Sequence, residues 1–363
     1  MHSLFPIKSR YNYLKNKDLH FFINFNTYCC LFKIYAYIWV LAVILPKSRM
    51  KQKSQYLGIF LGVIYGLIIR ILGDNEIFED YYNIYSISFL WVTPIVIGLF
   101  PILFSSNEIY KSKAKLFFYP IITIILFLIA ALITRIEDLV CLLIIGFPFL
   151  LVAGVIGLLL GAFVKDRIKD KKLYSIILIP LLLNPIENLI PNKEEVYSVS
   201  SEIIINKNKA EIFPNLLSVP TISDDEYKNG FYQEIGIPRP VNSEILTNEN
   251  QMYRIGHFTD DLKLYEYVSE IKENEFVNFK IDLSKSQLRE TPTDQHLLKS
   301  NYFNFENINY SLEYISETET KITLNCDYKI ESKMNFYANF WAKSIIGDFE
   351  KRLLESLKTK LEK

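Results

Sequence analysis

Long apolar runs fill the first half of this chain, and they end abruptly near residue 190. A membrane helix needs roughly 17–25 mostly apolar residues to cross the hydrocarbon core of a bilayer. Three runs fit that length, and two weaker runs accompany them; in chain order the five cover residues 56–72, 85–104, 116–133, 139–164 and 173–189. The pattern predicts an α-helical multi-span membrane region of about five helices over residues 50–190, with the bilayer as its partner.

Basic residues set the orientation of such a region, because loops rich in Lys and Arg stay in the cytoplasm. Basic loops alternate here with acidic or mixed loops, in the order 47–55, 74–83, 111–115, 135–138 and 165–172. This alternation predicts a multi-pass protein of the cell membrane whose C-terminal half lies outside the cytoplasm. The prediction requires that 173–189 crosses the bilayer. If that run is re-entrant, the C-terminal half lies in the cytoplasm.

Residues 1–49 fit this pattern less well, and we interpret them as an N-terminal extension. The apolar run 28–45 carries Lys33 near its middle, where a charge costs about 2.5–3.5 kcal/mol on insertion scales. Basic residues flank the run on both sides, so one flank violates the positive-inside tendency. Two hypotheses stay open. In the first, translation starts at Met50 or residues 1–49 are a dispensable extension. In the second, the run 28–45 is a true sixth span.

The formal net charge of zero hides two oppositely charged halves. Residues 1–190 hold 19 basic and 11 acidic residues, whereas the remainder holds 21 basic and 29 acidic, so the halves carry +8 and −8. An acidic half is repelled by phosphates, which argues against a nucleic-acid partner. The division at residue 190 therefore separates a basic membrane region from an acidic soluble domain, 191–363.

Period-two alternation of apolar and polar residues begins after residue 190 and is typical of strands with one buried face. The segments that show it are 195–205, 242–247, 251–258, 262–270, 275–283, 307–316 and 320–330. A four-residue repeat follows and predicts a long C-terminal helix over Asn335–Leu361. Its stripe contains Trp341, Ile345, Phe349, Leu353, Leu357 and Leu361, broadened by Ala338, Ala342 and Ile346. We assign Glu350 to another face of that helix. The pattern predicts an α+β domain in which a curved antiparallel sheet of about seven strands surrounds this helix.

Several segments of this half resemble the START-like, or polyketide cyclase/dehydrase-like (SRPBCC), superfamily. They are VSSEIIINKNKAEIFPNLLSVPTIS, IPRP at 237–240, LRETP at 288–292 and DYKIESKMNFYANFWAKSIIGDFEKRLLESLK. The chain is most similar to a bacterial subgroup in which the domain follows a multi-span membrane region. It departs from that subgroup at 259–262, TDDL, where relatives carry a longer loop. The resemblance implies a helix-grip fold with an apolar cavity that binds a lipid or another hydrophobic molecule.

Inward-facing residues of the strands and the helix would line such a cavity. Any one of them alone is more readily explained as a plain core residue, and only the set points to a cavity. The candidates are Phe279, Ile281, Tyr310, Leu312, Leu324, Tyr328, Trp341 and Ile345. Arg289 and Glu290 could cap its mouth, with Arg289 binding a carboxylate or phosphate headgroup; the alternative is a local ion pair. His257 and His296 have acidic neighbours but no metal-ligand spacing. We therefore expect no metal, no cofactor and no catalytic residue.

Three functions remain open at this point. The first is a membrane-anchored START-like domain that binds a hydrophobic small molecule or lipid between sheet and helix. The second is an accessory or gating domain of a membrane transport component. The third is an enzyme of the cyclase/dehydrase type, which is disfavoured because no set of positioned acids and bases is apparent in the sequence.

Overall fold

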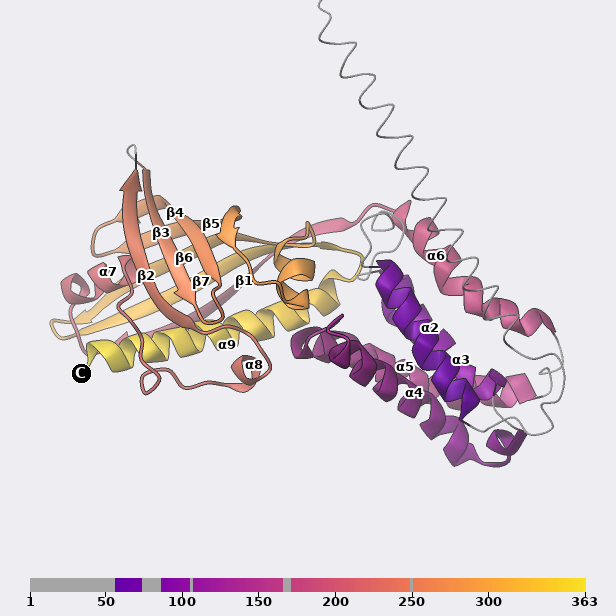
Figure 1. The fold of residues 1–363 in the computed structure, drawn as a ribbon. Coiled ribbons are helices and arrows are strands. Elements are labelled where there is room, and N and C mark those ends of the chain that lie inside the picture. Colours follow the sequence, from indigo (N-terminus) through magenta and orange to yellow (C-terminus); the bar gives the residue numbers. More distant parts are fainter. Residues whose placement is uncertain (1–55, 74–85, 105–106, 166–170, 249–250) are drawn as a thin grey trace, which may run out of the picture. The chain divides into compact units, whose positions relative to one another are not determined.

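A computed structural model describes residues 56–73, 86–104, 107–165, 171–248 and 251–363 (Figure 1). The N-terminal extension 1–49, with its run 28–45, lies outside the described residues. In what is described, helices fill the chain up to Asn188 and the first strand begins at Lys193. This change of element type falls where the sequence pattern changes.

The first part contains helices whose bounds follow the apolar runs. In chain order these are α2 (Leu57–Gly73), η1 (Ser88–Val92), α3 (Thr93–Phe104), η2 (Asn107–Lys111), α4 (Lys113–Ile133), α5 (Leu139–Lys165), η3 (Lys171–Leu178) and α6 (Ile179–Asn188). Within the described ranges, two helical stretches are long and apolar enough to cross a membrane. They are Lys113–Ile133 and Leu139–Leu159, with mean hydropathies of 2.8 and 2.9. The other apolar helices are shorter.

The run 173–189 was predicted as one span, but it is divided into the 3₁₀ element η3 and the short helix α6. The division falls just before Pro180, which has no N–H to continue a hydrogen-bond ladder and is best tolerated in the first turn of a helix. Glu187 near the end of α6 accepts hydrogen bonds from the Ile87 and Ser88 backbone N–H groups at 2.7 and 2.8 Å. This acidic residue therefore stabilises the start of η1, as expected for carboxylates at helix N-termini.

Small residues let α2 approach α4 and α3 closely. A Cβ atom on Gly62 would lie 2.7 Å from Cγ2 of Thr123, and one on Gly66 would lie 2.7 Å from the ring of Phe127. No side chain fits at these positions without displacing its neighbour. This agrees with the use of small residues in closely packed helix pairs.

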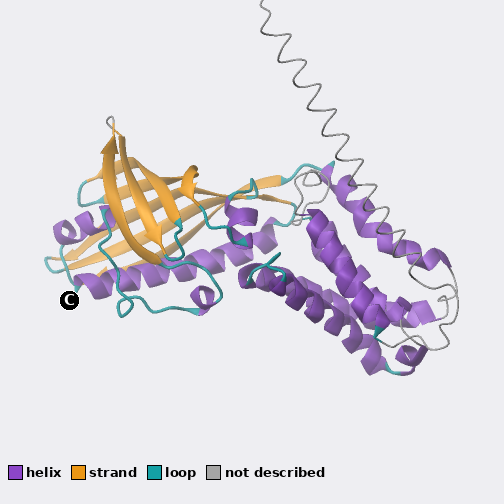
Figure 2. Ribbon diagram, viewed as in Figure 1, coloured by secondary structure: helices purple, strands orange, loops and turns teal. Residues whose placement is uncertain are grey.

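Seven antiparallel strands form a single sheet after residue 190, in the order β1-β7-β6-β5-β4-β3-β2 (Figure 2). Their bounds are β1 (Lys193–Ile205), β2 (Pro240–Asn248), β3 (Gln251–Phe258), β4 (Lys263–Lys272), β5 (Phe276–Gln287), β6 (Phe303–Ser316) and β7 (Glu319–Ser332). All seven predicted strands are present. Short helices α7 (Lys209–Leu217) and α8 (Phe231–Glu234) interrupt the chain between β1 and β2.

The sheet curves over the C-terminal helix α9 (Asn335–Leu361), whose bounds match the prediction (Figure 1). Register shifts occur in the β2–β3, β4–β5 and β6–β7 pairs, and such bulges bend the strands that carry them. A seven-stranded antiparallel sheet around one C-terminal helix fits the helix-grip fold. Alternation is cleanest in β7, where every second residue from Thr320 to Ser332 is buried.

One end of this domain is a packed core, and the other end holds a cavity. Leu353, Leu354 and Leu357 of α9 pack against β6, β7 and α7 in the core cluster. Nearer the N-terminus of α9, the residues that line the cavity, such as Ala338, Ala342 and Phe349, are only half-buried. Strands β5 and β6 pair only over Phe276–Phe279. Beyond that point the segment 288–302, which includes the π-helical turn η4 (Asp294–Leu298), connects the two strands.

Candidate functional site

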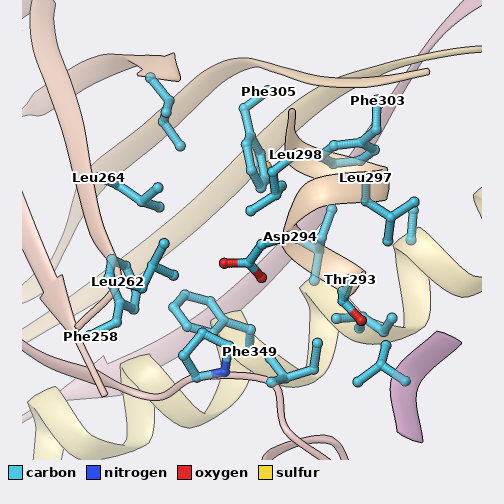
Figure 3. A pocket seen from close by; sticks show the side chains of 18 of the residues that line it. Phe258, Leu262, Leu264, Thr293, Asp294, Leu297, Leu298, Phe303, Phe305 and Phe349 are labelled. Carbon is cyan, nitrogen blue, oxygen red and sulfur yellow. The ribbon is translucent and has the colours of Figure 1, made fainter. Parts of the chain in front are cut away.

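A cavity of about 320 Å³ lies between the inner face of the sheet and α9. Its volume falls at the lower end of the range of about 300–1,000 Å³ that is usual for small-molecule sites. Apolar side chains of the strands, of the segment 288–302 and of α9 form most of its wall (Figure 3). Residues of α5, among them Val140 and Ile144, also line it. Phe258, Leu264 and Phe305 come from the sheet, and Phe349 faces them from the helix.

Six of the ten predicted site residues line this cavity. They are Ile281, Tyr310 and Leu324 on the sheet, Trp341 and Ile345 on α9, and Arg289 in the segment after β5. The other four lie elsewhere. Phe279 and Leu312 are buried in the packed core, and Tyr328 packs in a second apolar cluster and donates a hydrogen bond to Asn339 at 2.7 Å. Glu290 is exposed.

Arg289 pairs with Asp294, not with its neighbour Glu290. The guanidinium donates from Nε at 3.0 Å and from Nη2 at 2.7 Å to the two carboxylate oxygens of Asp294, and Nη1 donates to the carbonyl oxygen of Gly236 at 2.9 Å. The side chain of Asp294 is 2% exposed and that of Arg289 is 7% exposed. This bidentate geometry fastens the segment 288–302 to itself and to the loop before β2. It is a local ion pair, the alternative considered for Arg289 in the sequence analysis.

A buried ion pair lies in the wall formed by β3 and β4. Arg254 and Glu266 are directly opposite in the strand register, and Arg254 Nε donates to Glu266 Oε2 at 2.5 Å. Arg254 Nη1 also donates to the carbonyl oxygen of Leu216 at 2.8 Å, and the guanidinium carbon lies 3.7 Å from the ring centroid of Phe279. Burial raises the pKa of the nearby Tyr310 to about 12, so its phenol stays neutral beside this pair.

Glu350 of α9 is an acid inside the cavity wall, in contrast to its predicted place on another face of the helix. The residue is 2% exposed, it lines the cavity, and neither carboxylate oxygen makes a hydrogen bond to the described part of the protein. Burial raises the pKa of Glu350 to about 8, a shift only partly opposed by the Ser201 hydroxyl. The sequence did contain the signal, because the series Ala338, Ala342, Ile346 continues at Glu350 in steps of four.

Polar contacts join the segment 288–302 to the turn between α4 and α5. Asp138 accepts hydrogen bonds from the backbone N–H of Thr293 at 2.8 Å and from its hydroxyl at 2.6 Å. Arg70 at the end of α2 is completely buried and forms an ion pair with Glu137. Its Nη2 lies 3.2 Å from Nδ1 of His296. These pairings explain how an arginine is accommodated in an apolar helix, where an unpaired charge would be costly.

Glu137, Cys141 and His296 present ligand atoms that all lie within 4.8 Å of one another. Residues of these types can hold a metal ion, and the sequence contained no indication of the group because its members are distant in the chain. The Arg70 guanidinium, however, contacts both Glu137 and His296 and already supplies a positive charge there. A second cation would be repelled, so we interpret the group as an ion-pair network.

His257, the other histidine considered from the sequence, also lines the cavity. Its Nε2 lies 3.3 Å from Oε1 of Glu244 on the adjacent strand β2. Asp260 and Asp261 adopt positive φ values of 58° and 60° in the β3–β4 turn, a conformation that Asp tolerates better than most residues.

Comparison with known proteins gives no matching family model and no matching curated protein. Solved structures similar to part of the chain include an aromatase/cyclase from a Streptomyces species (9% identity, TM-score 0.31, covering 46% of this chain and 94% of that one). A START superfamily protein from Mycobacterium smegmatis is 11% identical, with a TM-score of 0.31, and the match covers 46% of this chain and 97% of that one. A norcoclaurine synthase mutant from Thalictrum flavum is 9% identical, with a TM-score of 0.29, and the match covers 47% of this chain and 96% of that one. At sequence identities this low, the similarity to these proteins is one of fold alone.

Proposed function

We propose that this protein is a membrane-anchored domain that binds a hydrophobic small molecule or lipid in the cavity between the sheet and α9. The observation that carries the proposal is the cavity of about 320 Å³ with its largely apolar wall. A well-packed interior contains few voids larger than a water molecule, so a space of this size between the sheet and α9 is consistent with a ligand site.

The membrane part of the proposal is supported by α4 and α5, which are long and apolar enough to cross a bilayer. The polar contacts of the segment 288–302 give further support, because they involve helix ends that the predicted topology places on the same side of the membrane. The end of α2 and the α4–α5 turn both contact the segment 288–302, as a bundle of alternating spans beneath the domain would require. On this basis we retain the multi-pass topology with an extracytoplasmic C-terminal domain as our proposal.

A second candidate function, a gating or accessory role in transport, is favoured by the same contacts. Thr293 and His296 line the cavity and also bind Asp138 and Arg70 of the helical part. A ligand that moves the segment 288–302 would therefore act directly on helix ends. Ligand binding must be established first, because both functions depend on it.

Filling the cavity tests the binding function. The full chain is reconstituted in phosphatidylcholine nanodiscs, and naphthylethanol is used as an apolar probe in equilibrium dialysis, with empty nanodiscs as the blank. We expect saturable binding that Ala342→Phe weakens at least tenfold, because Ala342 lines the cavity and a phenyl ring would occupy its space. The matched control is Lys343→Phe, which adds the same ring at an exposed position of α9.

Equal binding by the wild type and Ala342→Phe would place the probe outside the cavity and contradict the proposal. Absence of saturable binding to the wild type would contradict it too. Chemical conversion of a bound molecule would instead favour the cyclase-type alternative.

A further inference from the structure

The charges around the cavity are balanced with one exception. Arg254 pairs with Glu266, and Arg289 pairs with Asp294. Farther along the wall, the Glu137 carboxylate pairs with Arg70. Glu350 is the remaining carboxylate in the wall. The described residues supply no cation to it, and its oxygens make no hydrogen bond of normal geometry; the Ser201 hydroxyl on β1 is the nearby donor that lowers its pKa slightly.

A buried polar group without a partner costs free energy, about 1–3 kcal/mol or more for a charged group, and such groups are rare in folded proteins. Glu350 is 2% exposed, so bulk water does not satisfy it. Its position is set firmly, because Leu353 and Leu354 in the next turn of α9 belong to the packed core. The helix therefore holds an acid without an ion-pair partner against this cavity.

We propose that the cavity binds an apolar molecule carrying a single basic amine, and that the Glu350 carboxylate receives the ammonium group. This inference rests on the proposed function of the cavity and names the ligand class. An ammonium group supplies both things that Glu350 lacks, a positive charge and up to three N–H donors. Charge-assisted hydrogen bonds of this kind are about twice as strong as neutral ones, so an alcohol of the same shape binds less tightly.

Binding releases one proton. Burial raises the pKa of Glu350 to about 8, so at neutral pH the empty cavity holds a protonated acid. A free amine in water is an ammonium ion; when it enters, the Glu350 proton passes to solvent and the ion pair forms. Amine affinity therefore rises with pH up to about 8, by about tenfold per pH unit for a one-proton exchange.

The groups near enough to interact electrostatically with Glu350 do not share this titration. They are Ser201 on β1, Tyr310 on β6, and Cys326 and Tyr328 on β7. Burial raises the pKa of both tyrosines to about 12 and raises the pKa of Cys326 well above its ordinary value.

More distant charged groups around the cavity are the Arg254–Glu266 pair and the two histidines, His257 and His296. They are present in the wild type and in a Glu350 variant alike. A difference between the two pH profiles therefore belongs to Glu350.

The experiment compares naphthylethylamine with naphthylethanol, a pair that differs only in the polar group. The full chain in neutral phosphatidylcholine nanodiscs is dialysed against each probe at about pH 7.5, with empty nanodiscs subtracted. We expect the amine to bind the wild type at least tenfold more tightly than the alcohol. Glu350→Gln should remove that preference, so that the two probes bind this variant with similar affinity. Glu355→Gln, an exposed position on the same helix, should keep it.

Three results would overturn the inference. One is equal binding of both probes to the wild type, which leaves the cavity function intact and removes the role of the acid. Another is an amine preference that survives in Glu350→Gln and in the second variant Glu350→Leu. The third is an amine affinity with the same pH dependence, between about pH 6 and 7.5, in the wild type and in Glu350→Gln. Binding of neither probe would refute the cavity function together with the inference.

Discussion

Replacing Glu350 by Gln should change how the stability of the protein depends on pH. The pKa of Glu350 is raised from its ordinary value of 4.5 to about 8 by burial. Between these two values the folded protein keeps a proton that the unfolded chain has lost. Stability follows the difference in bound protons, ν(unfolded) minus ν(native). That difference is negative here, so Glu350 makes the wild type progressively less stable as pH rises from about 4.5 to about 8.

The expected loss of stability follows from the size of the pKa shift of Glu350. One pKa unit corresponds to about 1.4 kcal/mol, so the wild type should lose on the order of 4 kcal/mol across this window relative to Glu350→Gln. No large reduction for solvent screening applies, because Glu350 is 2% exposed. For a domain of this size, each kcal/mol moves the unfolding midpoint by roughly 2–4 °C. The two midpoints should therefore separate by roughly 8–16 °C between pH 5 and pH 8.

Thermal unfolding of the full chain in neutral detergent provides the assay. Tryptophan fluorescence is a suitable signal, since Trp341 lies in the cavity wall. The wild type, Glu350→Gln and the exposed control Glu355→Gln are measured at half-unit intervals of pH. The control should follow the wild type. Parallel profiles for the wild type and Glu350→Gln would refute the reasoning, because the buried acid would then have no abnormal titration in the folded protein.

Two further predictions concern other parts of the molecule. Glu266→Leu should destabilise the protein by about 3–5 kcal/mol, because Arg254, only 5% exposed, would be left as an uncompensated buried charge; the double variant Arg254→Met, Glu266→Leu should recover most of that loss. Equal denaturation midpoints for the single and double variants would contradict this. Single cysteines at positions 172 and 193, in a background without the native cysteines, test the topology: an impermeant thiol reagent applied to intact cells should label 193 and not 172. The opposite pattern would place the C-terminal domain in the cytoplasm.

Regular elements were predictable because their hydrophobic periods are local. Strand β7 alternates along its whole length, and the four-residue repeat of α9 predicted its bounds, Asn335–Leu361. The run 173–189 was harder to interpret, since a proline within an apolar run fits either a kinked span or two short elements. Here the chain forms two elements, η3 and α6.

The sequence by itself thus determined the order of helices and strands, the change of character near residue 190, and an apolar inner face for the sheet. Only the tertiary structure decided which charges meet. Arg70 and His296 are separated by 226 residues and Asp138 and Thr293 by 155, and Arg289 binds Asp294 instead of the adjacent Glu290. A side chain's burial and partners depend on the elements packed against it. The hydrophobic periodicity of a single segment carries no information about those elements. Glu350 is the clearest case: the sequence analysis assigned it to another face of α9, and only the tertiary structure buries it in the cavity wall without an ion-pair partner.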